Sequence, residues 1–278
     1  MQLGTIRLED GIAAVRVEGD EAVRLPFAGV EEILSSGRLD LAGSLDELGR
    51  LPLDSVEWAP LVSQPNKIIC VGLNYRDHVE EMGRDLPNAP TYFSKFSGSL
   101  IGANDELQLP DPSVSTHNDL EAELAIVIGT TARNVDAANA MGHVAGFTVF
   151  NDFSVRDYQT RTGQFLAGKT FERASGLGPV MVTVDEIGDG RGLGITSSVN
   201  GEVKQDSTTD QLVFGPNELI ADLSRIITLV PGDIIATGTP GGVGAARTPP
   251  QWLLPDDELT ISIDGIGELR HRCVIATT

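Results

Sequence analysis

Lysine, cysteine and long apolar runs are all scarce in this sequence of 278 residues. Its 20 basic side chains face 40 acidic ones, and the formal net charge of −20 disfavours partners that carry phosphate backbones or anionic lipids. We therefore expect binding neither to nucleic acid nor to membranes. No apolar run approaches the ~20 residues of a membrane-spanning helix, and no basic segment followed by an apolar stretch indicates a secretory signal. These absences predict a cytoplasmic protein.

The two cysteines, Cys70 and Cys273, both lie in apolar stretches. This placement is typical of buried reduced thiols and argues against a disulfide framework. Aromatic residues make up only 5% of the chain, but 41% of it is hydrophobic, which is ordinary for a globular protein and excludes a disordered or collagen-like chain. At roughly 150 residues per domain, the length predicts one large domain and a small one.

Lysine is rare even among the basic residues, since only four of the 20 are Lys and the other 16 are Arg. In such a chain, a Lys in an apolar or glycine-rich context suggests a local need for a compact point charge. Lys95 in Tyr-Phe-Ser-Lys-Phe and Lys169 in Ala-Gly-Lys-Thr-Phe have such contexts. Chance is the alternative explanation for each of them taken alone.

Residues 1–60 are predicted to form a small separate α/β unit. Asp10-Gly11 and Gly19-Asp20 are turn signals between short alternating segments, and the apolar spacing over residues 41–51 predicts a helix. Three prolines between residues 52 and 65 then indicate a linker. The second domain is predicted to comprise residues 65–278.

The second domain is dominated by predicted strands. Asn200-Gly201 and Asp264-Gly265 are hairpin signals, a helix is predicted from Pro216 to the Pro231-Gly232 pair, and a shorter helix is predicted after Asp136. The strands do not alternate with helices, which favours a strand-rich α+β domain over a Rossmann fold. The segments with strand length and β-branched content are residues 68–71, 124–128, 180–184, 195–199, 233–237, 259–263 and 269–275.

The run Asp-Leu-Glu-Ala-Glu-Leu-Ala-Ile-Val-Ile-Gly carries the first chemical signal. Extended from Asp119 to Gly129, it places Glu121 and Glu123 on one face, close enough for both side chains to converge on one ion. Carboxylate oxygens suit Mg²⁺, Mn²⁺ or Ca²⁺ better than Zn²⁺. An edge strand with two solvated glutamates is the alternative.

Asp152 is the candidate for a third ligand, because it follows an apolar run where a strand ends. Asp157 is the weaker candidate, because it follows Arg156 and is expected to pair with it. Arg156 and Gln159 are placed to reach a bound anion or carbonyl. A turn closed by a local salt bridge is the alternative.

His78 and Glu81 form a candidate acid–base pair. The segment from Asn74 to Gly83 predicts a short helix, with Asn74 as the N-cap and Gly83 just past its end. At a spacing of three residues, the two side chains can touch, and a carboxylate that holds an imidazole in one tautomer makes a competent general base. A helical surface pair is the alternative.

A glycine-rich stretch follows the strand at 233–236, with the sequence Ala-Thr-Gly-Thr-Pro-Gly-Gly-Val-Gly. It lacks the Gly-Lys-Ser/Thr ending of a P-loop, and the chain contains no Gly-x-Gly-x-x-Gly dinucleotide motif and no Gly-x-Ser-x-Gly elbow of serine hydrolases. We expect its backbone to approach a small ligand closely, with Thr237 or Thr239 offering a hydroxyl.

Taken in order, these motifs resemble the fumarylacetoacetate hydrolase family, from about residue 65 to residue 274. The motifs that carry the resemblance are Val-Gly-Leu-Asn-Tyr-Arg-Asp-His-Val-Glu-Glu, Phe-Ser-Lys-Phe, Leu-Glu-Ala-Glu-Leu-Ala-Ile-Val-Ile-Gly, Asn-Asp-Phe-Ser-Val-Arg-Asp-Tyr-Gln, Gly-Lys-Thr-Phe and Thr-Gly-Thr-Pro-Gly-Gly-Val-Gly. Residues 1–60 resemble the small N-terminal domain that many members carry. The resemblance implies a catalytic domain built as a mixed β-roll, usually in a homodimer, that binds Mg²⁺ or Mn²⁺.

The resemblance also assigns roles to individual residues. It implies metal ligands at Glu121, Glu123 and Asp152, and a water-activating pair of His78 and Glu81 on a segment that is often mobile. The family's two lysines correspond to Lys95 and Lys169, and its substrate-contacting positions to Arg156, Gln159 and Thr239.

The predicted activity is metal-dependent hydrolysis of a C–C bond in an acylpyruvate-like 1,3-diketo acid, a small anionic keto acid of the kind met in aromatic compound catabolism. In this hypothesis His78 activates water, Lys169 with Gln159 stabilises the oxyanion, and Lys95 with Arg156 binds the anionic groups. The nearest alternatives are an isomerase of 2-hydroxy-diene dioates and a decarboxylase of oxaloacetate-like acids. A non-catalytic small-molecule binding protein is the least favoured, because the His78–Glu81 pair and both lysines would then be superfluous.

Overall fold

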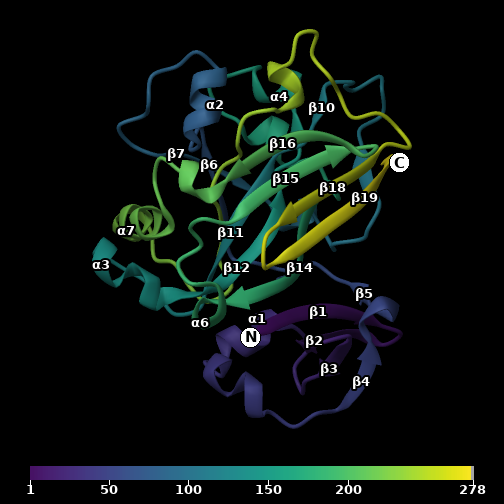
Figure 1. Cartoon of the computed structure of the whole chain (residues 1–278), viewed down its shortest axis with the longest axis vertical. Coiled ribbons are helices and arrows are strands. Elements are labelled where there is room, and N and C mark those ends of the chain that lie inside the picture. The colour runs from purple at the N-terminus through teal and green to yellow at the C-terminus, as the bar shows by residue number, and fades with distance from the viewer. Residues whose placement is uncertain (277–278) are drawn as a thin grey trace.

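The computed structural model describes residues 1–276, and most of its strands lie in two sheets (Figure 1). The first is 12-stranded and the second is five-stranded. In spatial order the first contains β4 (Gly49–Pro52), β3 (Glu21–Arg24), β2 (Gly11–Glu18), β1 (Gln2–Leu8), β14 (Ser175–Thr183), β12 (Val144–Asn151), β11 (Ala122–Ile128), β17 (Ile234–Ala236), β6 (Ile68–Gly72) and β7 (Thr91–Lys95), with β5 (Glu57–Trp58) beside β1 and β8 (Leu100–Ile101) beside β14.

The second sheet packs against the large one near β11, β12 and β14 (Figure 1). Its strands in spatial order are β16 (Glu202–Thr208), β15 (Gly194–Val199), β18 (Glu258–Ile263), β19 (Gly267–Ile275) and β9 (Leu107–Leu109). A further pair consists of β10 (Asn118–Asp119) and β13 (Ser154–Val155). The apolar side chains between the two sheets form one continuous core. This arrangement confirms the prediction of a strand-rich α+β protein without βαβ alternation.

The helices are short, with four to eleven residues each. They are α1 (Val30–Ser35), α2 (Arg76–Glu81), α3 (Ala137–Ala140), α4 (Arg156–Gln159), α5 (Leu166–Lys169), α6 (Val184–Ile187) and α7 (Pro216–Ile226). Six 3-10 segments accompany them, at Leu39–Ser44, Leu53–Ser55, Ser97–Ser99, Met141–His143, Thr209–Gln211 and Gly244–Ala246. None of the helices within residues 1–276 is both long and apolar enough to span a membrane.

The N-terminal strands extend the large sheet at the end opposite α2 and α4 (Figure 1). β1 pairs with β14, and the predicted hairpin turns at Asp10-Gly11 and Gly19-Asp20 are confirmed between β1, β2 and β3. The helix predicted over residues 41–51 is wrong. Its place is taken by a 3-10 turn at Leu39–Ser44 and by β4, because only Ala42 of that turn is buried and Leu41 and Leu48 are exposed. The division into two domains stays a prediction.

Helix α7 begins and packs as predicted but ends early. Glu218 accepts a hydrogen bond from the Gly215 N–H at 2.8 Å, and the apolar face of the helix is buried. The helix ends at Ile226 rather than near Pro231, because Leu229 leaves the helical path to pair with Ala132. The strand predictions and the turns at Asn200-Gly201 and Asp264-Gly265 are confirmed. Both cysteines are buried and free, as expected.

Acid sensitivity is expected at His271 on β19, which is 2% exposed. Its Nδ1–H donates to the Asp105 carbonyl at 2.8 Å, while Nε2 has no partner within the described chain. Burial lowers the pKa of His271 below 6.5, although the Asp105 carbonyl opposes this. Below pH 6.5, His271 is therefore protonated more readily in the unfolded state than in the folded state. The free energy of unfolding decreases as the pH drops below 6.5.

We predict that His271→Gln removes the contribution of this histidine to acid sensitivity. That contribution can reach a loss of about 1.4 kcal/mol in the free energy of unfolding per pH unit. Urea unfolding at pH 7.5 and pH 5, with metal chelated, measures it. The wild type is expected to lose more free energy of unfolding than the variant over this interval. Equal losses in the two proteins would contradict the assignment.

Candidate metal and active site

Three buried carboxylates converge where β11 begins and β12 ends. Oxygen atoms of Glu121, Glu123 and Asp152 lie within 4.8 Å of one another. The sheet register brings them together, because Ala122 pairs with Asn151 and the Asp152 N–H donates to the Glu121 carbonyl at 3.0 Å. β11 lies between β12 and β17, so the alternative of an edge strand with solvated glutamates is wrong.

Three cations lie against two of these carboxylates. Lys169 Nζ is 2.6 Å from Glu121 and 2.8 Å from Asp152, and Lys95 Nζ is 2.7 Å from Asp152. Arg156 contacts Glu121 at 2.6 Å and Asp119 at 2.7 Å. Although burial opposes ionisation, Lys169 and Arg156 lower the pKa of Glu121 to about 2. Burial also opposes the charge of Lys169, but Asp152 and Glu121 raise its pKa above 10.5.

Glu123 is the carboxylate without a cation. Within residues 1–276 no basic side chain forms an ion pair with it, and it accepts one hydrogen bond, from the Gly238 N–H at 2.9 Å. Burial first, and then Asp152 and Glu121, raise the pKa of Glu123 well above 4.5. Four acids, counting Asp119, thus face three cations. A divalent cation beside Glu123 would reverse this excess, and oxygen donors of this kind suit a hard cation, so the residues fit a metal site.

The acid–base pair is formed by residues of α2. His78 Nδ1 lies 2.9 Å from Glu81 Oε2, and the other Glu81 oxygen accepts a hydrogen bond from the Gly242 N–H at 2.9 Å. Because a carboxylate only accepts, Nδ1 carries the proton and Nε2 is the available base. His78 is 7% exposed and lines the same cavity as Glu121 and Glu123. His78 therefore faces the carboxylates from a buried position, while Glu81, itself exposed, holds the other ring nitrogen. The pair is not a solvated helical surface pair.

Asn74 does not have its predicted role. The N-terminal cap of α2 is Tyr75, whereas the Asn74 amide donates to the carbonyls of Phe214 and Thr237 at 3.0 and 2.7 Å. These contacts hold the start of the helix against two distant segments. Gly83, with φ of 61°, follows the last cap residue as predicted.

The glycine-rich loop also differs from its prediction. Its backbone approaches the protein's own carboxylates as N–H donors: Gly238 to Glu123, Gly241 to Asp77, Gly242 to Glu81, and Gly244 and Ala245 to Asp119. Gly242 has a φ of 103°, and a Cβ there would lie 2.1 Å from the Lys204 carbonyl oxygen. Glycine is therefore required so that the loop can reach these acids.

A cavity of about 230 Å³ joins the predicted residues. Seven of the ten predicted site residues line it: His78, Glu121, Glu123, Arg156, Gln159, Lys169 and Thr239. The other three do not line it: Glu81 contacts His78, Asp152 contacts Lys169, and Lys95 contacts Asp152. Asp157 does not pair with Arg156, because its carboxylate accepts from the Ser115 hydroxyl at 2.7 Å.

Sequence reasoning missed two residues of the site. Asp119 accepts hydrogen bonds from the Arg156 Nε–H at 2.8 Å and from the Gly244 N–H at 2.8 Å. It lies two positions before Glu121, so the same alternation that revealed the glutamates would have included it. Arg84, exposed and just past α2, lines the cavity, and no pattern in the sequence distinguishes it.

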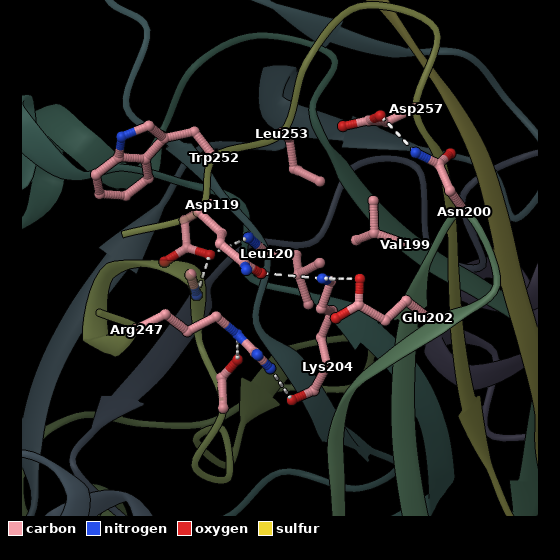
Figure 2. Close-up of a pocket in the computed structure, with 13 residues that line it drawn as sticks. Asp119, Leu120, Val199, Asn200, Glu202, Lys204, Arg247, Trp252, Leu253 and Asp257 are labelled. Carbon is pink, nitrogen blue, oxygen red and sulfur yellow. Dashed lines mark hydrogen bonds and ion pairs between the residues drawn. The ribbon is translucent and has the colours of Figure 1, made fainter. Parts of the chain in front are cut away.

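A second cavity, of about 330 Å³, shares the glycine-rich loop with the first and is shown in Figure 2. Gly242 and Gly244 line this one, whereas Val243 and Ala245 line the first. Its polar groups are mostly occupied by one another: Lys204 with Glu202 and Gln251, Asn200 with Asp257, and Arg247 with the carbonyls of Gly242 and Lys204. No base faces a carboxylate cluster there, so the reactive groups belong to the first cavity.

The chain is similar to proteins of one known family. A family model described as "Fumarylacetoacetate (FAA) hydrolase C-terminal" matches residues 67–274. The chain is 44% identical over 245 residues to "Oxaloacetate tautomerase Fahd2a, mitochondrial" of Rattus norvegicus, covering 88% of this chain and 77% of that protein. It is 40% identical over 232 residues to "Oxaloacetate tautomerase YisK" of Bacillus subtilis (strain 168), covering 82% and 77%.

Solved structures show the same fold. A fumarylacetoacetate hydrolase from psychrophilic Exiguobacterium antarcticum superposes with a TM-score of 0.90 at 31% identity, covering 99% of this chain and 100% of that one. A 2-hydroxyhepta-2,4-diene-1,7-dioate isomerase from Mycobacterium marinum gives a TM-score of 0.81 at 29% identity, covering all of both chains.

We predict that Glu123→Gln abolishes stabilisation by Mn²⁺. Wild-type protein is expected to unfold several degrees higher in Mn²⁺ than in chelator, because the ion binds the folded state only. The variant is expected to show almost no difference and to be at least as stable as wild type without metal, since it buries no unpaired charge. Thermal unfolding with and without Mn²⁺ measures both effects.

Glu202→Gln is the matched control, since Glu202 pairs with Lys204 outside the site, and it is expected to keep the full Mn²⁺ shift. An undiminished shift in Glu123→Gln would remove Glu123 from the ligand set.

Proposed function

This chain belongs to the fumarylacetoacetate hydrolase family, and we propose that it is a divalent-metal-dependent enzyme that interconverts the keto and enol forms of small 2-oxo dicarboxylates such as oxaloacetate. The observation that carries the proposal is the single base, His78, facing the carboxylate cluster. Likeness to two proteins named oxaloacetate tautomerase supports the choice of substrate. We therefore prefer an isomerase, one of the alternatives in the sequence analysis, to the hydrolase that the sequence analysis favoured.

The metal would be Mg²⁺ or Mn²⁺, held by Glu121, Glu123 and Asp152. When bound, it supplies Lewis-acid polarisation of the substrate's 2-oxo and carboxylate oxygens. Lys95 contacts Asp152 and the Phe153 carbonyl, so we assign it to holding Asp152 in place instead of binding substrate.

His78 is the proposed proton carrier. Its Nε2 would take a proton from the substrate's C3, and Glu81, fixed by the Gly242 N–H, would stabilise the imidazolium. Overall, a C–H bond breaks at C3 and an O–H bond forms at the C2 oxygen, with His78 carrying the proton between them, so water is neither consumed nor released. Lys169 and Gln159 line the cavity and would stabilise the negative charge that develops on oxygen.

Hydrolysis of acylpyruvates remains the second candidate, because the same His78–Glu81 pair can deprotonate a water molecule. The family relationship also underlies the remaining proposals. These are a homodimer, a role in aromatic compound catabolism, and a β-roll catalytic domain at residues 65–278 preceded by a small domain at 1–60. The cytoplasmic location expected from the sequence stays a prediction.

A substrate panel tests the proposal. With Mg²⁺ or Mn²⁺ present, we expect faster loss of the enol form of oxaloacetate, followed by its ultraviolet absorbance, without release of CO₂. His78→Asn is expected to lower this rate by roughly 10² to 10⁴, whereas His117→Asn, at an exposed histidine outside the cavity, is expected to leave it unchanged.

Other outcomes would replace the proposal with a named alternative. CO₂ release would establish a decarboxylase, and cleavage of an acylpyruvate without enol turnover would establish a hydrolase. Conversion of a hydroxymuconate-type dioate alone would establish a diene dioate isomerase.

Arg84 is proposed to bind the second carboxylate of the substrate. It lines the cavity and forms no ion pair within residues 1–276, whereas Arg156 and Lys169 are already paired with protein carboxylates. We predict that Arg84→Gln raises KM for oxaloacetate roughly 3- to 10-fold, because an exposed charge pair is modest in strength. Inhibition by pyruvate, which lacks the second carboxylate, is expected to change less than about two-fold.

Arg76→Gln is the matched control, since Arg76 is exposed on α2 but does not line the cavity. If Arg84→Gln weakens the binding of pyruvate and of oxaloacetate by the same factor, then Arg84 contacts the 2-oxo acid head group that both molecules share. The assignment of Arg84 to the second carboxylate would then be wrong.

A further inference from the structure

Gln205 lies outside the cavity but contacts two parts of its wall. It is on β16, in the second sheet, and is 1% exposed. Its Oε1 accepts hydrogen bonds from the Ala122 N–H at 3.0 Å and the Ser197 hydroxyl at 2.9 Å. Its Nε2 donates to Thr239 Oγ1 at 2.7 Å and to the Pro240 carbonyl at 2.9 Å. Each polar atom of the amide is therefore occupied.

The orientation of this amide is fixed by backbone groups. The Ala122 N–H can only donate, and the Pro240 carbonyl can only accept. If the amide were flipped, its NH₂ group would face the Ala122 N–H, and its oxygen would face the Pro240 carbonyl oxygen. Two donors would then meet on one side and two acceptors on the other, which would leave several buried groups without hydrogen bonds. The NH₂ group must therefore face Thr239.

The position of β17 explains why Gln205 is needed at Ala122. β17 pairs with β11 only at Ala125–Val127, so the N–H of Ala122 extends past the end of that strand. Gln205 takes the place of the missing strand partner, at the residue that lies between Glu121 and Glu123.

The orientation of Gln205 has a consequence for Thr239. Thr239 Oγ1 already accepts a hydrogen bond, its hydroxyl donates to no acceptor within residues 1–276, and the residue lines the cavity. We propose that Gln205 is a positioning residue that fixes the Thr239 hydroxyl as a hydrogen-bond donor to a carboxylate or carbonyl oxygen of the substrate. This rests on the proposed function for the identity of the substrate, but not for the direction of the hydrogen bond.

A merely structural role would predict a different pattern of losses. Removing Gln205 would then lower stability, and lower activity by the same factor whatever residue stood at 239. If Gln205 acts through the hydroxyl, its removal matters only while the hydroxyl is present. A double-mutant cycle separates the two cases.

The cycle combines Gln205→Leu with Thr239→Val, at saturating Mn²⁺, with Mn²⁺ affinity measured for each variant. Thr239→Val is expected to lower kcat/KM roughly 10- to 100-fold, the range for a hydrogen bond to a charged group. Gln205→Leu is expected to cause a similar loss in the wild type and at most about a two-fold loss in the Thr239→Val background. In the Thr239→Ser background, which keeps the hydroxyl, Gln205→Leu is expected to lower kcat/KM as much as in the wild type.

Affinity for oxalate, a planar dianion of the size of the 2-oxo acid head group, gives a readout without turnover. The same coupling is expected in its Kd. Failure of the wild type to turn over any 2-oxo acid would contradict the proposed function, while the oxalate cycle would still decide the role of Gln205. Equal fold losses from Gln205→Leu in both backgrounds would overturn that role.

If Gln205→Leu does not fold, Gln205→Glu takes its place in the cycle. It keeps the oxygen that faces Ala122 and Ser197, and its ionised side chain would accept a hydrogen bond from Thr239 instead of donating one. Gln205→Glu is again expected to lower kcat/KM in the wild-type background but not in the Thr239→Val background. A decrease of kcat/KM that persists in the Thr239→Val background would count against the proposal.

Discussion

The rest of the site depends on one electrostatic constraint, the burial of four carboxylates against three cations. Lys95, Lys169 and Arg156 satisfy Asp119, Glu121 and Asp152, which leaves Glu123 with a single backbone hydrogen bond. An unpaired buried carboxylate is costly, and it is tolerated in an enzyme when a cation or a substrate step requires it. In the proposed site, a metal ion beside Glu123 would supply the positive charge that this carboxylate lacks.

The same excess of acid explains the support around the site. In a chain with a net charge of −20, few cations remain for structural use, and the glycine-rich loop supplies backbone N–H groups in their place. These groups hold Glu81, Asp119 and Glu123 in position. The same loop therefore holds the partner of His78, the partner of Arg156, and Glu123. A movement of this loop would shift all three carboxylates together.

The sequence was most informative where a local pattern determined the chemistry. Alternation along one strand placed Glu121 and Glu123 together, and a spacing of three placed His78 beside Glu81. It was least informative where distant segments meet. Gln205 lies 83 residues from Ala122, and Asn74 bonds Thr237 across 163 residues. Neither contact has a local signature, so Asn74 was read as a cap and Gln205 was not identified. The helix predicted at 41–51 is wrong for a related reason: whether its apolar residues are buried depends on packing against distant segments, and Leu41 and Leu48 are exposed.

The most direct test of the metal assignment is the anomalous X-ray signal of crystals soaked in Mn²⁺. We expect one strong peak coordinated by oxygens of Glu121, Glu123 and Asp152, in the cavity that His78 lines. A peak elsewhere, such as beside Glu202 in the neighbouring cavity, or no peak at Glu123, would contradict it.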